Sequence, residues 1–156
     1  MTVESLEAVR KQITVEVPQE RAFDVFTTQM AAWWNPDHHI GANPYVELVI
    51  EPREGGGWFE VDADGARCPW GNVLVWDPPA RVVLNWQLNG QWAYDPEQLT
   101  ELELRFTALS DSSTLVELEH RKLEGLGAGA AEARAQLDDP AGWQGLLGRF
   151  AAQLTR

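Results

Sequence analysis

The pattern of hydrophobic and polar positions is clearest at the end of the chain. Over residues 140–156, apolar side chains recur at the spacing of one face of an α-helix. The members of this stripe are Trp143, Leu146, Leu147, Phe150 and Leu154. Asp138 and Asp139 precede Pro140, and proline is tolerated at the first position of a helix. The pattern therefore predicts a helix with a broad apolar face.

Glycines within this helix indicate that it does not stand alone. Gly142, Gly145 and Gly148 lie among the apolar residues, and each costs about 1 kcal/mol relative to alanine in a helix interior. A helix with three such residues needs a partner surface, and the missing side chains let that partner come close. We therefore expect the helix to pack lengthwise against the rest of the protein.

The rest of the chain predicts one strand, a helical segment and then six strands. Apolar and polar residues alternate over residues 9–17, as in a half-buried strand. Residues 20–30 predict a short helix, which can extend to Trp34. The six strands are predicted at residues 45–50, 58–61, 67–76, 81–86, 100–109 and 114–120. Because no helix separates these strands, they indicate an antiparallel meander. Residues 124–136 predict a connection that is helical from about residue 129 to 137.

Charge and cysteine content narrow the class of protein. The chain has 156 residues, with 12 Lys and Arg against 24 Asp and Glu and a formal net charge of -12. This balance argues against nucleic acid and anionic membranes as partners, since both require a basic surface. No apolar run is long enough to span a membrane, and residues 1–10 lack the pattern of an export signal. Cys68 is the only cysteine, which suits a reducing compartment. We expect one domain over residues 1–156, located in the cytoplasm.

Several segments of the sequence together resemble a known family. They are Val17-Pro18 with Ala22-Phe23-Asp24-Val25-Phe26 and Trp33-Trp34, then Glu54-Gly-Gly-Gly-Trp58, residues 71–86, and Gly142-Trp143. Over residues 9–154 the chain resembles the homologues of the activator of the heat-shock-protein-ninety ATPase, in the START-like (SRPBCC) superfamily. The resemblance implies an α+β helix-grip fold, in which a curved antiparallel sheet of about seven strands wraps around a long C-terminal helix. It also implies a hydrophobic cavity between the sheet and that helix.

The resemblance implies more than one function. The superfamily includes lipid carriers, polyketide cyclases and co-chaperone domains, and a fold does not by itself settle a function. The co-chaperones of the family carry an additional domain that docks on the chaperone. Since 156 residues are too few to include one, we do not expect a chaperone partner.

The candidate ligand site consists mainly of aromatic residues. Tryptophans either fill a core or line a flat-walled pocket for an apolar or aromatic ligand, and the sequence leaves both alternatives open. We expect Trp143 to face the sheet, because it belongs to the apolar stripe. The candidate ligand-binding residues are Trp33, Trp34, Trp58, Glu60, Trp70, Trp86, His120, Trp143, Leu147 and Phe150.

Two polar residues of this set have alternative interpretations. His120 shares strand parity with Val116 and Leu118, so it is expected to point inward, either as a hydrogen-bonded core histidine or as a polar anchor for a ligand. Glu60 shares a face with Trp58. It is either a solvated residue paired with Arg67 across a turn or a buried acid.

Other motifs predict no catalytic, metal or cofactor site. His38 and His39 follow Asp37, but adjacent side chains on an extended loop diverge and no further ligand lies at metal-binding spacing. Cys68 has no histidine or basic residue arranged to activate it. We find no phosphate-binding loop, nucleophile elbow or dinucleotide fingerprint.

Three functional hypotheses follow. The first is a non-enzymatic protein that binds a small apolar or aromatic molecule. The second is an enzyme of the cyclase or dehydratase class, with His120, Glu60 or Tyr94 as general acid or base. The third is a stress-related interaction module, for which a homodimer is possible. We favour the first hypothesis, because the sequence shows an apolar helix and an aromatic sheet but no coherent catalytic set.

Overall fold

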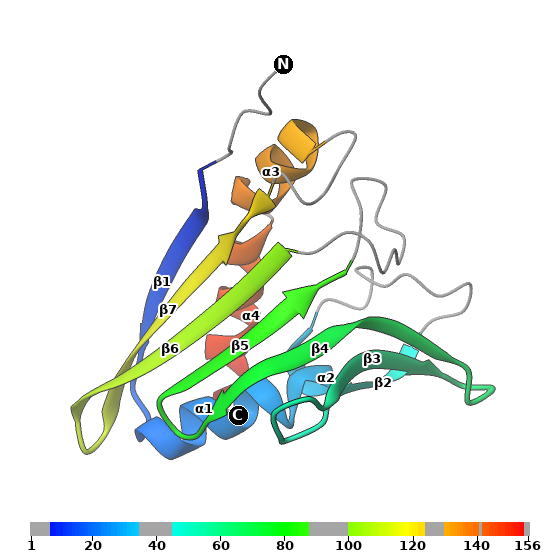
Figure 1. The fold of residues 1–156 in the computed structure, drawn as a ribbon. Coiled ribbons are helices and arrows are strands. Elements are labelled where there is room, and N and C mark those ends of the chain that lie inside the picture. Colours follow the sequence, from blue (N-terminus) through cyan, green and yellow to red (C-terminus); the bar gives the residue numbers. More distant parts are fainter. Residues whose placement is uncertain (1–6, 35–44, 88–99, 124–129, 141, 155–156) are drawn as a thin grey trace.

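A single antiparallel sheet and four helices make up the described part of the computed structural model, which covers residues 7–34, 45–87, 100–123, 130–140 and 142–154 (Figure 1). In chain order the elements are β1 (Val9–Val15), α1 (Gln19–Thr27), α2 (Met30–Trp33), β2 (Tyr45–Ile50), β3 (Gly57–Asp62), β4 (Arg67–Asp77), β5 (Arg81–Trp86), β6 (Thr100–Ser110), β7 (Ser113–Arg121), α3 (Ala130–Asp138) and α4 (Trp143–Leu154). The predicted α+β order of one strand, helices, six strands and a final helix is confirmed.

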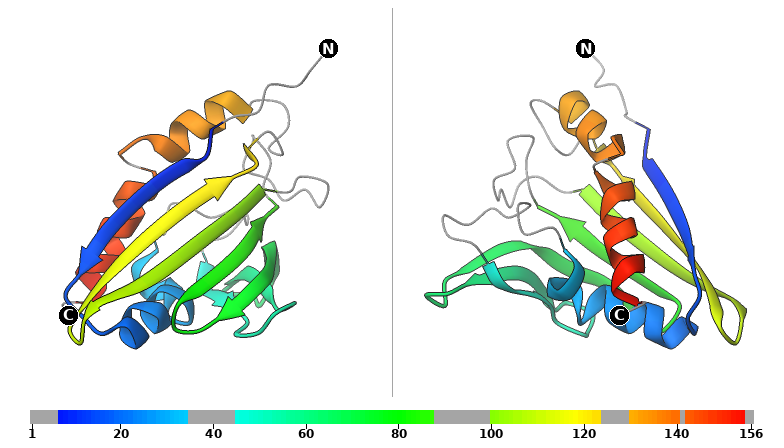
Figure 2. Two further views of the ribbon diagram at one scale, coloured as in Figure 1. Left: turned by 60° about the vertical axis from the view of Figure 1, so that its left-hand side comes forward. Right: turned by 180° about the vertical axis from the view of Figure 1, so that it is seen from behind.

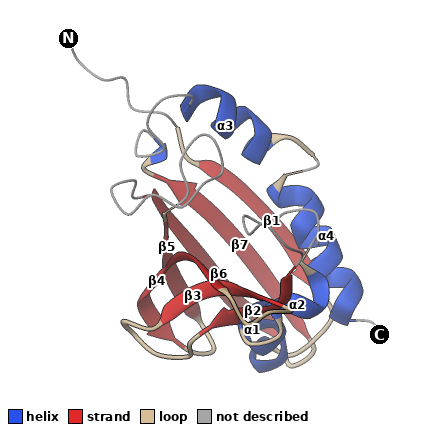
Figure 3. Cartoon of the chain, turned by 90° about the vertical axis from the view of Figure 1, so that its right-hand side faces the viewer, coloured by secondary structure: helices blue, strands red, loops and turns tan. Residues whose placement is uncertain are grey.

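The sheet has seven strands in the order β1-β7-β6-β5-β4-β3-β2. Neighbouring strands are antiparallel, and β1 closes the order by pairing with β7, from Val9 opposite His120 to Val15 opposite Thr114. Figure 2 shows α4 lying across one face of the sheet, while α1 and α2 gather at its lower end. Figure 3 shows the same helix running along one side of the curved sheet. The predicted helix-grip fold is confirmed.

The core forms where the apolar face of α4 meets the inner face of the sheet. All five residues of the predicted stripe are buried. On β7 every second residue points inward, including Val116, Leu118 and His120, and their β6 neighbours Leu102 and Leu104 are fully buried. The alternation in the sequence therefore placed these side chains on the correct face.

Helix α4 begins later than the predicted segment 140–156 because the chain turns sharply before it. Gly142 donates a hydrogen bond from its N–H to the Asp139 carbonyl, at 2.7 Å, and the helix begins at the next residue. A side chain at position 142 would collide with the carbonyl oxygens of Gln136 and Leu137 at the end of α3. The glycine thus allows α3 and α4 to meet at a tight corner.

Local backbone geometry corrects one further prediction and interrupts the regular alternation of one strand. The helix predicted at 20–30 is divided, because Gln29 leaves the helical conformation and α2 begins only at Met30. Along β4 a register shift lies between Val73 and Val75, so that Val73 pairs with the buried Leu84 and Trp76 with the buried Val82.

The outer face of the sheet carries a ladder of ion pairs. Arg121 on β7 contacts Glu101 and Glu103 on β6, and Glu119 on its own strand. Burial would raise the pKa of Glu103, but hydrogen bonds from Arg121 and Arg81 outweigh it and hold that pKa below its usual value. These contacts tie three neighbouring strands together on the side away from α4. No helix within the described ranges is long and apolar enough to cross a membrane.

Candidate ligand site

The tryptophan-rich part of the interior lies where several elements begin or end. Strand β5 ends at Trp86, β6 begins at Thr100, β7 reaches His120 one residue before its end, and α4 begins at Trp143. Since Trp86 is paired with Thr100 and Leu102 with His120, these residues lie together at one end of the sheet (Figure 1). We call this region the tryptophan end and define it as Trp34, Trp58, Glu60, Trp70, Trp86, Thr100, His120 and Trp143.

Five tryptophan rings of this end form a closed circuit. The ring centroids lie 5.2 Å apart for Trp34 and Trp70, 5.3 Å for Trp70 and Trp58, and 5.6 Å for Trp58 and Trp86. Trp143 closes the circuit at 5.5 Å from Trp86 and 5.9 Å from Trp34. Most of these pairs meet edge to face, which is a favoured geometry for aromatic rings. None of the five side chains is more than 4% exposed.

His120 anchors this circuit through two hydrogen bonds. The Trp143 indole N–H donates to His120 Nδ1 at 3.1 Å, and His120 Nε2 lies 2.8 Å from Thr100 Oγ1. Because an indole nitrogen can only donate, Nδ1 must be the acceptor and the proton must be on Nε2. The Thr100 hydroxyl oxygen accepts a hydrogen bond from Nε2–H, and the hydroxyl donates in turn to the Trp86 carbonyl, at 3.2 Å.

The same geometry keeps His120 neutral. The imidazole is fully buried, and this burial lowers its pKa to about 3. Protonation of Nδ1 would also turn this atom from an acceptor into a donor, and the Trp143 indole N–H would lose its hydrogen-bond acceptor. His120 is therefore inward-facing, as predicted, and acts as a hydrogen-bonded core residue. It accepts no proton near neutral pH.

Glu60 is the second polar group of the tryptophan end. Its Oε1 accepts a hydrogen bond from the Trp70 indole at 3.0 Å, and the residue is 1% exposed. The expectation of a solvated pair with Arg67 is wrong: Arg67 is exposed and its guanidinium lies 4.8 Å from the centre of the Phe59 ring. The alternative, a buried acid beside the tryptophans, describes the structure.

Trp58 leaves one buried polar atom without a partner. Its indole Nε1 has no access to solvent and no hydrogen-bond acceptor in the part of the chain that the structure describes. The residue itself is completely buried between the rings of Trp70 and Trp86. Such atoms are rare in folded proteins because each costs about 1–3 kcal/mol.

Of the remaining candidate residues, Trp33 adjoins the tryptophan end, with its ring centroid 5.6 Å from that of Trp34, and Leu147 and Phe150 follow Trp143 along α4. Trp33 contacts Phe26 and Phe150 with ring centroids 4.9 and 5.7 Å away, and its indole donates to the Val25 carbonyl at 3.0 Å. Leu147 is buried on the same helix as Phe150. Phe23, Phe26, Phe106 and Phe150 pack edge to face there, and we call these four residues the phenylalanine end. The predicted set is therefore divided between two regions.

Sequence reasoning overlooked Thr100 and could not place several other residues. Thr100 is fully buried, and only the pairing of β5, β6 and β7 brings its hydroxyl to His120. The sequence signal that could have identified Thr100 was a threonine on the buried face of its strand, opposite a tryptophan. Tyr94, His38 and His39 lie outside the described residues, so the roles weighed for them stay predictions.

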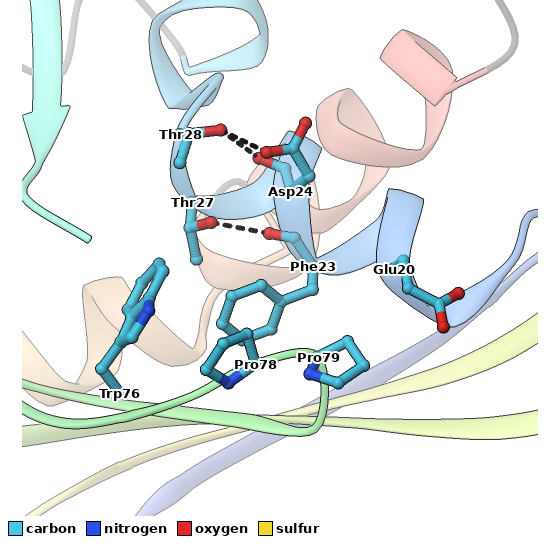
Figure 4. Close-up of a pocket in the computed structure, with 8 residues that line it drawn as sticks. All are labelled: Glu20, Phe23, Asp24, Thr27, Thr28, Trp76, Pro78 and Pro79. Carbon is cyan, nitrogen blue, oxygen red and sulfur yellow. Dashed lines mark hydrogen bonds between the residues drawn. The ribbon is translucent and has the colours of Figure 1, made fainter. Parts of the chain in front are cut away.

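The cavity between sheet and α4 stays a prediction as well. The described rings of the tryptophan end touch one another, so a ligand there would have to separate them. A pocket of about 340 Å³ lies elsewhere, between α1 and the turn that joins β4 to β5 (Figure 4). Its lining residues are Glu20, Phe23, Asp24, Thr27, Thr28, Trp76, Pro78 and Pro79.

The fold and these contacts define a helix-grip protein of the START-like (SRPBCC) superfamily. A family model described as "Activator of Hsp90 ATPase homolog 1-like protein" matches residues 16–155. The chain therefore belongs to this family, as the sequence predicted. No functionally curated protein matches the chain.

Solved structures with the same fold include a synthase, a resistance protein and a protein from a biosynthetic locus. An anthrahydroquino-γ-pyrone synthase, Txn09, is 37% identical, with 97% of this chain and 99% of that chain covered and a TM-score of 0.67. CalC from Micromonospora echinospora, a self-sacrificing resistance protein, is 27% identical over 95% and 94% of the chains, with a TM-score of 0.71. DynU16, from the dynemicin biosynthetic locus, is 20% identical, and the match covers 96% of this chain but 47% of that one, with a TM-score of 0.61. The last similarity shows the fold alone.

Proposed function

We propose that the protein binds a planar, polycyclic aromatic molecule bearing carbonyl or hydroxyl oxygens, and that it does so at the tryptophan end, between the sheet and α4. Binding pockets for such molecules have aromatic walls and a few fixed polar groups. The tryptophan end supplies five indole rings together with Glu60 and His120. Flat rings of this kind favour stacked and edge-to-face contacts with a flat ligand.

The observation that carries the proposal is the buried indole N–H of Trp58. A donor without an acceptor is costly inside a protein, and it finds no acceptor among the described residues. A ligand carbonyl oxygen placed beside Trp58 would supply that acceptor. The same interaction would orient the ligand, because apolar contacts alone do not fix its direction.

The other polar groups suit an uncharged or hydroxylated ligand. His120 is neutral and its two ring nitrogens are already hydrogen bonded to Trp143 and Thr100. It therefore offers no positive charge to an anion. Glu60 presents a carboxyl group that accepts hydrogen bonds, as it does from Trp70, and a ligand hydroxyl is a donor of the matching kind.

Similarity to the synthase supports the chemical class of this ligand. The name of that synthase refers to a fused aromatic ring system, and the synthase is 37% identical to this chain over nearly the full length of both. The proposal requires the touching tryptophan rings to move apart as the ligand enters. Binding should therefore change both indole fluorescence and the packing of the circuit.

Titration with 1,8-dihydroxyanthraquinone tests the proposal. Saturable quenching of tryptophan fluorescence is expected, and Trp58→Phe, which keeps an aromatic ring but removes the N–H, should weaken binding by about tenfold. Trp76→Phe is the matched control, because Trp76 is half-buried beside Phe23, away from the circuit. Anthracene, which lacks oxygens, should bind the wild type and Trp58→Phe equally. Quenching that does not saturate, or an anthraquinone affinity that Trp58→Phe leaves unchanged, would refute the proposal.

A second candidate is a ring-closing enzyme, which the similarity to the synthase favours. In that case Glu60 is the candidate general acid or base, because it is buried among the aromatic rings. With a pKa of about 3, His120 cannot serve as a base near neutral pH. Incubation with an anthrahydroquinone whose side chain can close to a γ-pyrone should give a cyclised product by mass spectrometry. Glu60→Gln should abolish this product while preserving binding. If the wild-type protein binds the compound but forms no product, the enzyme hypothesis is refuted and only the binding function is supported.

A further inference from the structure

The five rings of the tryptophan circuit are not held equally firmly. Trp58, Trp70 and Trp86 lie on β3, β4 and β5, and each of these strands is paired on both sides. Trp143 lies on α4, a helix of 12 residues, and its indole N–H is hydrogen bonded. Trp34 instead lies at the C-terminal end of α2, a helix of four residues. Since a helix this short is not stable alone, Trp34 belongs to the least firmly held element of the circuit.

The backbone of Trp34 is clamped by one residue of α4. Arg149 donates from Nε to the Trp33 carbonyl at 2.9 Å and from Nη2 to the Trp34 carbonyl at 3.5 Å. Because these two carbonyl groups belong to the peptide bonds on either side of the Trp34 Cα atom, the guanidinium fixes the direction in which the Trp34 side chain points. Arg149 itself is exposed, so its side chain can be replaced without disturbing the core.

The neighbouring tryptophan, Trp33, has an anchor of its own. Its indole donates to the Val25 carbonyl at 3.0 Å, and its ring packs against Phe26 and Phe150. These contacts hold Trp33 to α1 and to the middle of α4 without using the Arg149 guanidinium. A rotation about the backbone of Trp34 can therefore withdraw one indole ring and leave the other in the core.

We propose that Trp34 is the gate of the tryptophan end and that Arg149 is the latch that holds this gate closed. In the closed form the Trp34 ring lies against Trp70 and Trp143, with centroids 5.2 and 5.9 Å away. Its withdrawal frees the same two ring surfaces for a flat ligand. The inference rests on the ligand site proposed above and assigns the ring movement that entry to this site requires. Because the closed form excludes the ligand, the latch weakens binding: the apparent dissociation constant is the intrinsic value divided by the open fraction.

Hydrogen exchange of the indole N–H groups, followed by nuclear magnetic resonance, tests the latch without any ligand. Arg149→Met keeps the aliphatic part of the side chain but removes its donors, and it should raise the open fraction about fivefold. Opening exposes the rings that Trp34 covers, so the indole N–H groups of Trp70 and Trp143 should exchange about fivefold faster. The Trp33 indole is the internal control, because its anchor is separate from the gate, and its exchange rate should not change. An equal rise at all three indoles would indicate general destabilisation and would overturn the assignment of the latch.

Titration of the same variant with 1,8-dihydroxyanthraquinone tests whether the gate controls entry. Arg149→Met should bind this ligand about fivefold more tightly, through faster association and an unchanged dissociation rate. A residue that merely supported the site would weaken binding when it is replaced. Arg134→Met is the matched control. Arg134 on α3 likewise donates from Nε to a backbone carbonyl, that of Glu7 at 2.7 Å, and its replacement should change neither indole exchange nor binding.

The two measurements separate failure of the gate from failure of the proposed function. If Arg149→Met binds the anthraquinone with wild-type or weaker affinity, or if the Trp70 and Trp143 indoles exchange no faster than in wild type, the gate is refuted. If these indoles exchange faster but neither protein binds the anthraquinone saturably, the gate is supported and the function proposed for the tryptophan end is refuted.

Discussion

The two ends of the interior are equally buried but chemically different. The phenylalanine end consists of Phe23, Phe26, Phe106 and Phe150, whose rings carry no polar atom and need no hydrogen bond. At the tryptophan end the indole N–H groups of Trp70 and Trp143 are hydrogen bonded by the titratable side chains Glu60 and His120, and that of Trp58 has no acceptor among the described residues. Phenylalanine would fill comparable space without these costs. The phenylalanine end is therefore held by apolar contacts alone, whereas the tryptophan end also depends on buried hydrogen bonds.

Truncation of a core ring should have the largest effect. Phe150→Ala removes a fully buried side chain from the middle of the phenylalanine end, and a loss of about 3–5 kcal/mol in the free energy of unfolding is expected. Urea unfolding followed by circular dichroism measures this loss. At a temperature where the variant is still folded, its dissociation constant for 1,8-dihydroxyanthraquinone should stay near that of wild type. A cost below about 1 kcal/mol would mean that this end is loosely packed.

Acid should destabilise the protein through the tryptophan end. The His120 pKa is about 3 in the folded protein, against 6.5 for the unperturbed group. Below pH 6.5 the unfolded chain takes up a proton that the native protein does not, so stability present above this pH is lost as the pH falls. The expected slope is up to about 1.4 kcal/mol per pH unit between pH 6.5 and 4.5.

The variant His120→Gln isolates this contribution. It should lower stability at pH 7 and flatten the profile of unfolding free energy between pH 6.5 and 4.5. Below that window Glu103 and Glu119, whose pKa values are held low by arginine hydrogen bonds that outweigh burial, add their own loss of stability on protonation. An unchanged slope in the variant between pH 6.5 and 4.5 would contradict the assigned His120 pKa.

Two matched threonines allow a direct comparison of the ends. Thr100→Val removes the acceptor for His120 Nε2–H and should cost about 1–3 kcal/mol, since a buried donor is left unsatisfied. Thr27→Val, at the other end, removes a hydroxyl that donates only to the Phe23 carbonyl, at 2.7 Å on its own helix. The cost there should be below about 1 kcal/mol, because that carbonyl keeps its helical hydrogen bond. If chemical denaturation gives equal losses of unfolding free energy for the two variants, the two ends do not differ in their dependence on a threonine hydroxyl.

The smallest effect is expected on the outer face of the sheet. Arg10 pairs with Glu119 at 3.1 Å, but its side chain is 69% exposed. Arg10→Ala should therefore cost less than about 1 kcal/mol, and the difference should shrink further in 1 M salt. Thermal unfolding at two salt concentrations measures it. A larger cost would mean that ion pairs on the outer face of the sheet contribute to the free energy of unfolding, in addition to the two interior ends.

Periodicity in the sequence predicted those features that depend on single elements. The five residues of the α4 stripe are all buried, and the inward position of His120 follows from the alternation along β7. Glycine and proline in the turns allowed the six successive strands to be recognised. These features depend on local repeats, which the sequence displays directly.

The closed circuit of tryptophans could not be predicted, because it depends on how strands are aligned. Register shifts between Trp58 and Phe59 on β3 and between Val73 and Val75 on β4 alter which side chains meet across the sheet. The partnership of Thr100 with His120 likewise requires the pairing of β6 with β7. The local repeat of apolar residues does not show how distant strands are aligned. The sequence therefore indicated the candidate residues but not their contacts.

The pairing of β1 with β7 has a consequence for how the protein is made. Val9 pairs with His120, so during synthesis β1 has no β7 partner until more than a hundred further residues have been added. During that interval its unpaired edge is open to other chains. Completion of the sheet requires contacts between residues that are very distant in sequence. Such contacts slow folding relative to a sheet in which each strand pairs only with the next strand along the chain. A nascent chain that stalls before residue 113 therefore presents an incomplete sheet to the chaperones of the cell.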